Sequence, residues 1–338
     1  MKVLIVTAPN EFALADMDIP ETDGYEVLVK HEGCLICNST DRKIIERLFA
    51  TKDYPVALGH ESFGKVVKVG DKVRNFQLGD RVICSNAIPK GYDGTYYSTW
   101  GGFSEYGIAG DYDALVEDGQ SVEGEYAYRK RYIANYKIDE TLPIEQAGVV
   151  FPLAETASSI MQTPEIKGKD VAVFGTGFAG YTLAIFAQKM GAKSVTVFGK
   201  RAERIALAKE IGIENAKHVD EAYAESNKYD VVFEATGKHD VFARGLPFLR
   251  ENGYVIIHGA YVAPYEFNLS ATPVNYHIRT VNPKVGEAIG YVQERIKKGE
   301  IPIDALLTHV WELSQIERAF RQVQNGEVVK GLVKIGER

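Results

Sequence analysis

Hydrophobic and polar residues alternate in short runs along the first part of the chain, up to about Leu153. Residues 25–31 alternate with a period of two, and residues 64–70 and 80–84 alternate more loosely. Glycine and aspartate separate these runs, as they commonly do between the strands of small barrels. The pattern predicts a small, barrel-like β domain.

From Asp170 onward, short apolar runs alternate with longer segments of helical pattern. Residues 171–174 predict a buried strand, 181–190 a helix and 195–198 a second strand. Strands separated by helices are typical of a parallel, doubly wound sheet, so the fold class is α/β. The series continues with the helical residues 202–211 and the apolar runs 230–233 and 254–257.

The last part of the chain is expected to return to the β domain. Residues 283–298 place apolar side chains on one face of a helix, and residues 331–335 have strand character. We therefore predict a β-rich domain of residues 1–155 and 287–338, with an α/β domain of residues 156–286 inserted into it.

Composition and charge narrow the class of protein. The chain has 338 residues, 45% of them hydrophobic and 25% charged, a balance typical of a globular enzyme of two domains. A formal net charge of −7 without a basic stripe argues against a nucleic-acid partner. No apolar run approaches the roughly 20 residues that span a bilayer, which argues against a membrane partner.

Two features of the chain bear on the cellular compartment of the protein. The first six residues are an apolar strand without a cleavage-site pattern, so we expect no signal peptide. The three cysteines, Cys34, Cys37 and Cys84, cannot all pair. We therefore expect a cytoplasmic location, where thiols stay reduced.

A glycine motif, Gly175-Thr176-Gly177-Phe178-Ala179-Gly180, follows the predicted strand 171–174 and opens the next helix. In this context the first glycine allows a tight turn, and the second lets the backbone approach a pyrophosphate. The third lets strand and helix pack closely, with the phosphates at the helix N-terminus. The motif predicts a nicotinamide dinucleotide site that includes Phe178 and Ala179; the alternative is a glycine-rich turn without a ligand.

The end of the second strand bears on which dinucleotide binds. NAD sites usually carry an acidic residue about 20 positions after the motif, where it binds the ribose 2′-hydroxyl. Here Gly199, Lys200 and Arg201 occupy that place. Two cations can pair with a 2′-phosphate, so we predict NADP, with NAD as the alternative because Glu203 is close enough in sequence to bind a ribose.

Cys37, His60 and Glu61 supply a thiol, an imidazole and a carboxylate within the β domain. Zinc takes these three ligand types, and a catalytic site leaves one position open. The spacing is not that of a zinc finger, because Cys34 and Cys37 form the only C-x-x-C pair. Buried packing and a redox pair are therefore alternatives to a metal site.

An aromatic-rich segment spans residues 85–136. We interpret it either as a surface excursion that packs on itself or at a subunit contact, or as a lobe over a substrate cleft. Its aromatic residues are Tyr92, Tyr96, Tyr97, Trp100, Tyr106, Tyr112, Tyr126, Tyr128, Tyr132 and Tyr136.

Nearly the whole chain resembles the zinc-containing medium-chain dehydrogenases, the alcohol and polyol dehydrogenase group. The resemblance rests on many short motifs in the same order. They are the segments 33–37 (GCLIC), 59–64 (GHESFG), 79–82 (GDRV), 101–106 (GGFSEY), the glycine motif and 230–237 (DVVFEATG). It implies a GroES-like catalytic domain and a Rossmann cofactor domain. Thr236 and His258, at strand ends of the Rossmann domain, are expected to contact the cofactor.

The resemblance also implies roles for particular residues. Cys37 and His60 match zinc ligands, and Glu61 matches the carboxylate that joins or leaves the metal. Ser39 matches the hydroxyl that bonds the substrate oxygen, with Thr40 as the alternative because this segment is one residue longer than usual.

This chain departs from the family in two places. The position of the third zinc ligand holds Phe151, so zinc would need Glu61, a water or Glu155 instead, although Glu155 also suits a helix start. The four-cysteine lobe that binds a structural zinc is missing, so we expect one catalytic zinc and no structural zinc.

The sequence therefore predicts an enzyme that passes a hydride between the nicotinamide cofactor and an alcohol, a polyol, or the matching ketone or aldehyde. Relatives suggest a homodimer or homotetramer. Two alternatives remain: a zinc-free reductase of an activated carbon–carbon double bond, which Phe151 favours, and a dinucleotide-binding relative without enzymatic activity.

Overall fold

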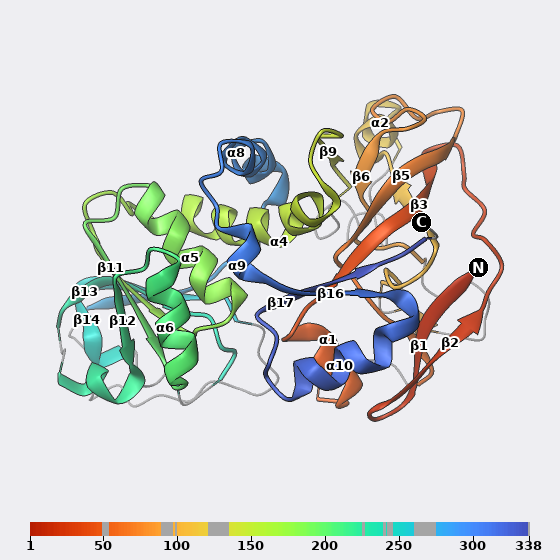
Figure 1. Ribbon diagram of the computed structural model, residues 1–338. Helices are drawn as coiled ribbons and strands as arrows, with labels where there is room; N and C mark the ends of the chain where they lie inside the picture. Colours follow the sequence, from red (N-terminus) through yellow and green to blue (C-terminus); the bar gives the residue numbers. More distant parts are fainter. Residues whose placement is uncertain are drawn as a thin grey trace. The chain divides into compact units, whose positions relative to one another are not determined.

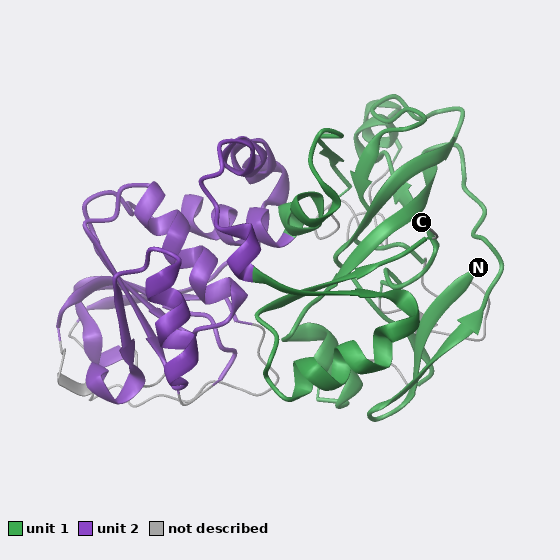
Figure 2. Ribbon diagram, viewed as in Figure 1, with its two compact units in different colours: residues 1–151, 307–338 green, residues 152–306 purple. Residues whose placement is uncertain are grey.

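The chain divides into two compact units, shown in Figure 2. Unit 1 comprises Met1–Phe151 and Leu307–Arg338, and unit 2 comprises Pro152–Leu306. The sequence predicts residues 152–155 and 287–306 in the β-rich domain, whereas the structure groups them with unit 2. Residues 287–306 include nearly all of helix α8 (Val285–Lys297). The computed structural model describes residues 1–48, 54–88, 97–98, 100–120, 135–224, 227–238, 241, 246–259 and 275–336.

Unit 1 is rich in β structure, as the alternating pattern predicted (Figure 1). Its larger sheet has the order β16-β17-β3-β5-β6-β9, with β8 pairing with β3. Its smaller sheet has the order β2-β1-β4-β7. The bounds are β1 Lys2–Ala8, β2 Glu11–Asp16, β3 Glu26–Ile36, β4 Val56–Ala57, β5 Ser62–Val69, β6 Arg81–Ile83, β7 Tyr97–Ser98, β8 Tyr106–Gly110, β9 Lys137–Ile138, β16 Leu307–Glu312 and β17 Lys330–Lys334.

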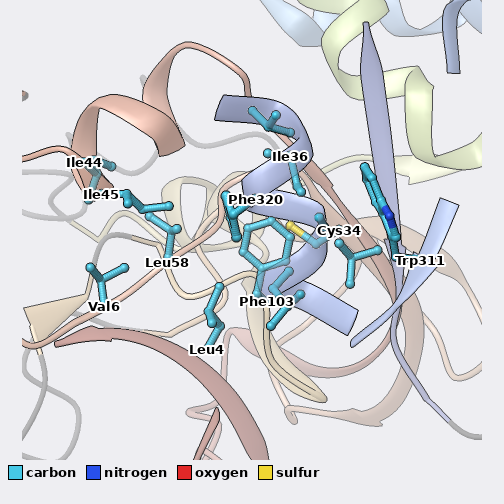
Figure 3. Close-up of a cluster of buried hydrophobic side chains, with 14 of the residues drawn as sticks. Leu4, Val6, Cys34, Ile36, Ile44, Ile45, Leu58, Phe103, Trp311 and Phe320 are labelled. Carbon is cyan, nitrogen blue, oxygen red and sulfur yellow. The ribbon is translucent and has the colours of Figure 1, made fainter. Parts of the chain in front are cut away.

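An apolar cluster joins the smaller sheet of unit 1 to two helices (Figure 3). Leu4 comes from β1, Ile44 from α1 (Thr40–Ile45) and Phe320 from α10 (Ile316–Gln324). Phe103, which is fully buried, packs edge-on against Phe320 with ring centroids 5.8 Å apart. Burial of this apolar surface holds α1 against the sheet and so fixes where the segment before α1 lies.

The remaining helices of unit 1 are short, and one long helix passes from unit 1 into unit 2. Helix α2 (Tyr112–Glu117) is capped by Asp111, whose side chain accepts from the Ala114 N–H. Helix α4 (Ile144–Met161) contains the boundary between the two units. The 3₁₀ turn η4 (Leu313–Gln315) precedes α10.

Unit 2 contains the parallel sheet that the sequence predicted, with the order β12-β11-β10-β13-β14-β15. Its first strand, β10, is central, and all five of its residues are buried. The bounds are β10 Asp170–Phe174, β11 Ser194–Gly199, β12 Asn215–His218, β13 Tyr229–Glu234, β14 Leu249–Ile257 and β15 Tyr276–Thr280, with α5 Phe178–Lys189, α6 Ala202–Glu210, α9 Ile303–Leu306, η1 Val219–Ala224 and η2 Leu246–Phe248.

The strand order of unit 2 reverses direction at β10, because the chain moves outward first through β11 and β12 and then through β13 to β15. Ligands of open parallel sheets bind at the carboxyl ends of strands beside such a switch point. The glycine motif begins directly after β10, so the topology places it at that position.

Within the described ranges, no helix is both long enough and apolar enough to cross a membrane. Residues 89–96, 99 and 121–134 of the predicted aromatic segment, including Tyr92, Tyr96, Tyr126, Tyr128 and Tyr132, lie outside the described residues.

His31 makes unit 1 sensitive to acid. Its side chain lies in β3 with 1% exposure, and its Nδ1 is 2.6 Å from the Ser104 carbonyl oxygen. Burial lowers the pKa of His31 to about 4. The unfolded chain takes up this proton near pH 6.5, so the free energy of unfolding should fall by up to roughly 3 kcal/mol as the pH drops from 6.5 to 4.

This prediction can be checked by urea unfolding of wild type and His31→Asn at several pH values. Trp100 and Trp311 both belong to unit 1, so tryptophan fluorescence reports on its unfolding. We expect the variant to be less stable near neutral pH. Its free energy of unfolding should also fall less steeply between pH 6.5 and pH 4 than that of wild type. Equal slopes in the two proteins would contradict the prediction.

Candidate active site

Three side chains of metal-ligand type meet at one end of the β3–β5 pair. The two strands are antiparallel, with Cys34 opposite Ser62. Cys37 follows the end of β3, and His60 and Glu61 precede the start of β5, so all three emerge at the same edge. Their ligand atoms lie within 4.8 Å of one another. Sulfur, imidazole nitrogen and carboxylate oxygen together are a zinc-type donor set.

Asp41 connects two members of this cluster. From the first turn of α1, its Oδ2 accepts from the Cys37 backbone N–H at 2.8 Å, and its Oδ1 lies 3.1 Å from His60 Nδ1. Its side chain is fully buried. A carboxylate on Nδ1 holds the proton there and leaves Nε2 with a lone pair for a metal. In the sequence, the only signal for Asp41 was its position four residues after Cys37.

Lys330 places a buried positive charge against this cluster. It lies at the start of β17, and its Nζ is 2.7 Å from Oε1 and 2.6 Å from Oε2 of Glu61. The Lys330 and Glu61 side chains are only 5% and 2% exposed. Glu61 is therefore shared between the ammonium group and the metal-ligand cluster. No sequence signal connected Lys330 with Glu61, because 269 residues separate them.

The electrostatics of the cluster favour positive charge. Burial lowers the pKa of His60, but the Asp41 carboxylate and Cys37 outweigh it, so the net pKa is well above the ordinary value. The pKa of Lys330 is also raised: burial opposes this, while Glu61 and Cys37 favour it. A proton held on His60 occupies a place that a metal cation would take. The donor set therefore suits a divalent cation.

The two candidate hydroxyl residues lie between Cys37 and α1. Ser39 Oγ accepts from Lys43 Nζ at 3.1 Å, and Lys43 is buried. The Thr40 backbone N–H donates to Cys37 Sγ at 3.4 Å. Both residues are thus adjacent to the proposed ligand Cys37, and the Lys43 ammonium group orients the Ser39 hydroxyl oxygen.

Phe151 and Glu155 both belong to α4, but they fall in different units. Phe151 ends the first segment of unit 1 and is 8% exposed. Glu155 belongs to unit 2, and the group of metal-ligand type found among the described residues contains only Cys37, His60 and Glu61. The metal role of Glu155 stays a prediction.

The glycine motif has the geometry of a phosphate-binding turn. Gly175 has φ +134°, which side chains rarely adopt, and Gly177 is the N-cap of α5 with open space where a Cβ would be. A Cβ on Gly180 would lie 1.9 Å from the Gly175 carbonyl oxygen. The first turn of α5, including Phe178 and Ala179, therefore packs closely on the turn, and a helix N-terminus of this kind is suited to bind an anion.

Gly199 ends β11 and lies against the glycine motif. A Cβ at this position would come within 2.3 Å of Thr176 Cγ2, so any side chain, including an acidic one, would displace Thr176. Lys200 follows, and Arg201 is the N-cap of α6, with its Nε 3.6 Å from a Glu203 carboxylate oxygen. This end of β11 therefore carries two cations and has no room for a side chain at Gly199.

Thr236 lies directly beside the glycine motif. A Cβ on Gly175 would be 3.3 Å from Thr236 Cγ2. Buried Glu234 holds this turn, because it accepts from the Thr236 hydroxyl, from the Thr236 N–H at 2.6 Å and from the Gly237 N–H at 3.0 Å. In the sequence, Glu234 stands out only as part of the segment 230–237, which does not reveal this role.

His258 follows β14, and the Ser159 hydroxyl orients its ring. Its Nδ1 is 2.9 Å from Ser159 Oγ, which in turn donates to the Glu155 carbonyl oxygen at 2.9 Å. The Ser159 oxygen therefore accepts from a protonated Nδ1, and Nε2 keeps its lone pair. Burial lowers the pKa of His258 to about 4, so the ring is neutral near pH 7. Ser159 is another residue that sequence reasoning missed.

Sequence models of known families match both units. The family described as "Alcohol dehydrogenase GroES-like domain" matches residues 23–117, and "Zinc-binding dehydrogenase" matches residues 180–298. Together they cover more than half of the chain. The GroES-like and Rossmann parts expected from the resemblance are thereby confirmed.

Proteins that are similar to this chain over nearly its whole length support the same family. The chain is 25% identical to D-arabinitol dehydrogenase 1 of Uromyces fabae, covering 99% of this chain and 97% of that protein. It is 28% identical to a sorbitol dehydrogenase of Halalkalibacterium halodurans, covering 98% and 99%. A protein of Sinorhizobium meliloti, named "putative zinc-binding dehydrogenase" and solved with NADP, has the same fold, with a TM-score of 0.77, 23% identity and 98% of each chain covered. The chain belongs to the zinc-type medium-chain alcohol dehydrogenase family.

Proposed function

We propose that this protein is a zinc-dependent oxidoreductase that passes a hydride between NADP and an alcohol or polyol, or the matching ketone or aldehyde. The observation that carries the proposal is the convergence of Cys37, His60 and Glu61 within 4.8 Å in a chain that also has a dinucleotide-binding turn. Relatives named as arabinitol and sorbitol dehydrogenases support the substrate class.

Zinc bound by Cys37, His60 and Glu61, with a water or Glu155 as a further ligand, would supply Lewis-acid polarisation of the substrate oxygen. The protein's own groups organise this site. Asp41 keeps the proton on His60 Nδ1, and Lys330 balances the charge of Glu61.

The proton of the substrate hydroxyl needs a path as the hydride leaves. The partly exposed Ser39 hydroxyl can accept it while releasing its own proton to solvent water, with the Thr40 hydroxyl as the alternative. Lys43 Nζ, 3.1 Å from Ser39 Oγ, orients the Ser39 oxygen. Bound NADP would supply the hydride acceptor or donor, a chemistry that belongs to the cofactor.

Two features of unit 2 favour NADP over NAD. Gly199 has no room for the acidic side chain that binds a ribose 2′-hydroxyl, because Thr176 fills that space. Lys200 and Arg201 adjoin the N-terminus of α6, where a 2′-phosphate would meet both cations and backbone N–H groups. Thr236 and His258 would contact the nicotinamide end from β13 and β14.

We also propose one catalytic zinc per chain and a homodimer or homotetramer in the cytoplasm. The chain has only three cysteines, too few for a four-cysteine zinc site. Strand β15 ends the described order of the parallel sheet, and most of its residues are exposed. Backbone groups at such an edge can pair with a second copy.

A zinc-free reductase of an activated double bond is the second candidate, because Phe151 replaces a ligand position. Metal analysis of the purified protein distinguishes the two. Close to one zinc per chain supports the dehydrogenase, and an active protein without bound metal supports the reductase.

Replacing Cys37 by Ser should remove the metal and lower dehydrogenase activity by about a thousand-fold or more, because the thiolate ligand and the polarisation are lost together. Dinucleotide binding, followed by NADPH fluorescence, should be retained. Cys84→Ser is the matched control, since Cys84 is buried and donates to the Ile108 carbonyl instead. Full activity of a metal-free Cys37→Ser protein would contradict the mechanism.

Replacing Arg201 by Ala should raise the KM for NADP by roughly ten- to one hundred-fold, since a hydrogen bond to a charged group is lost. The KM for NAD should change less than about two-fold, because NAD lacks the 2′-phosphate. Lys209→Ala, near the other end of α6, should alter neither value. Equal losses for both cofactors would argue against a 2′-phosphate contact.

A further inference from the structure

The indole ring of Trp100 lies against the imidazole of His60. Their ring centroids are 5.0 Å apart, with an angle of 55° between the planes. One side of Trp100 packs on the apolar cluster of unit 1, yet the residue as a whole is only half-buried. His60 likewise keeps 16% of its side chain exposed. The two rings thus line the same accessible part of the metal-ligand cluster.

Backbone hydrogen bonds bring Trp100 to this place. The Gly102 N–H donates to the Gly59 carbonyl at 2.7 Å, and the Phe103 N–H donates to the Leu58 carbonyl at 3.0 Å. The segment 100–103 therefore runs beside the residues that lead into His60. The Trp100 carbonyl in turn accepts from the Ile88 N–H at 3.0 Å.

Trp100 adopts a backbone conformation that is unfavourable for a bulky residue. Its φ is +73°, in the left-handed region that favours glycine. Such conformations persist where surrounding contacts enforce them, and they cluster at functional sites. A ring that served only the apolar cluster could be fully buried, as Phe103 is, without this cost.

We propose that Trp100 is a substrate-contacting residue that determines specificity, forming an aromatic wall beside the metal site for the carbon chain of a polyol. This inference rests on the proposed function. If a polyol oxygen is held at the metal-ligand cluster, the neighbouring carbons of the polyol lie within reach of the Trp100 indole. The π face attracts polarised C–H groups, and the indole N–H can donate to a hydroxyl farther along the chain. A short monohydric alcohol has no atoms to make these contacts.

The first test compares Trp100→Ala and Trp100→Phe with wild type on D-arabinitol, D-sorbitol and 2-propanol. The alanine variant should raise the KM for both polyols by about ten-fold, and phenylalanine by less, with kcat within about two-fold. The KM for 2-propanol and the zinc content should not change. Trp311→Phe is the matched control, since Trp311 is buried and its Nε1 donates to Gln322.

A second measurement does not depend on activity. The chain has two tryptophans, so the Trp311→Phe protein emits from Trp100 alone. Adding D-sorbitol to the zinc-loaded form should change this emission with saturation, and the zinc-free form should respond much less. This readout also applies if the Trp100 variants fold poorly.

The outcomes separate the two proposals. A wild-type protein that binds no metal and oxidises no alcohol contradicts the proposed function. A zinc-loaded, active protein contradicts the role of Trp100 alone if the Trp100→Ala variant keeps the polyol KM within about two-fold. The same holds if saturating D-sorbitol leaves the Trp100 emission unchanged.

Discussion

The antiparallel pairing of β3 with β5 is the constraint on which the candidate metal site depends. It brings Cys37, at the end of one strand, to His60 and Glu61, at the start of the next. A shift of the register by one residue would reverse the face of every side chain in the pair and separate these ligands. The apolar cluster of unit 1 supports the arrangement by holding α1, and with it Asp41, beside the strand ends.

Around this pairing, the site is built from charges that balance in a buried environment. Asp41 and Glu61 bring two carboxylates, and Lys330 compensates for one of them. Buried carboxylates persist only when they are paired or hydrogen-bonded. Lys330 pairs with Glu61, so the negative charge of Asp41 acts on His60 and raises its pKa. The cluster is therefore suited to a cation, and the same balance links metal affinity to proton concentration.

The proposed cofactor site of unit 2 depends on two glycines that lack a side chain. The missing side chain at Gly177 leaves the backbone open to phosphate, and the missing side chain at Gly199 leaves space that Thr176 occupies. Lys200 and Arg201 then provide charge where NAD enzymes usually have a carboxylate. The proposed preference for NADP thus rests on steric exclusion together with two positive charges.

The sequence alone determined the two-part architecture, the parallel sheet, the dinucleotide turn and the identity of the possible metal ligands, because hydrophobic period, glycine spacing and ligand chemistry are local properties. Motif order added the family. Only the tertiary structure could assign Asp41 to His60, Lys330 to Glu61, Ser159 to His258 and Trp100 to the metal-ligand cluster. Three of these pairs are formed by residues far apart in the chain, and all four depend on how strands and helices pack, which no local pattern encodes.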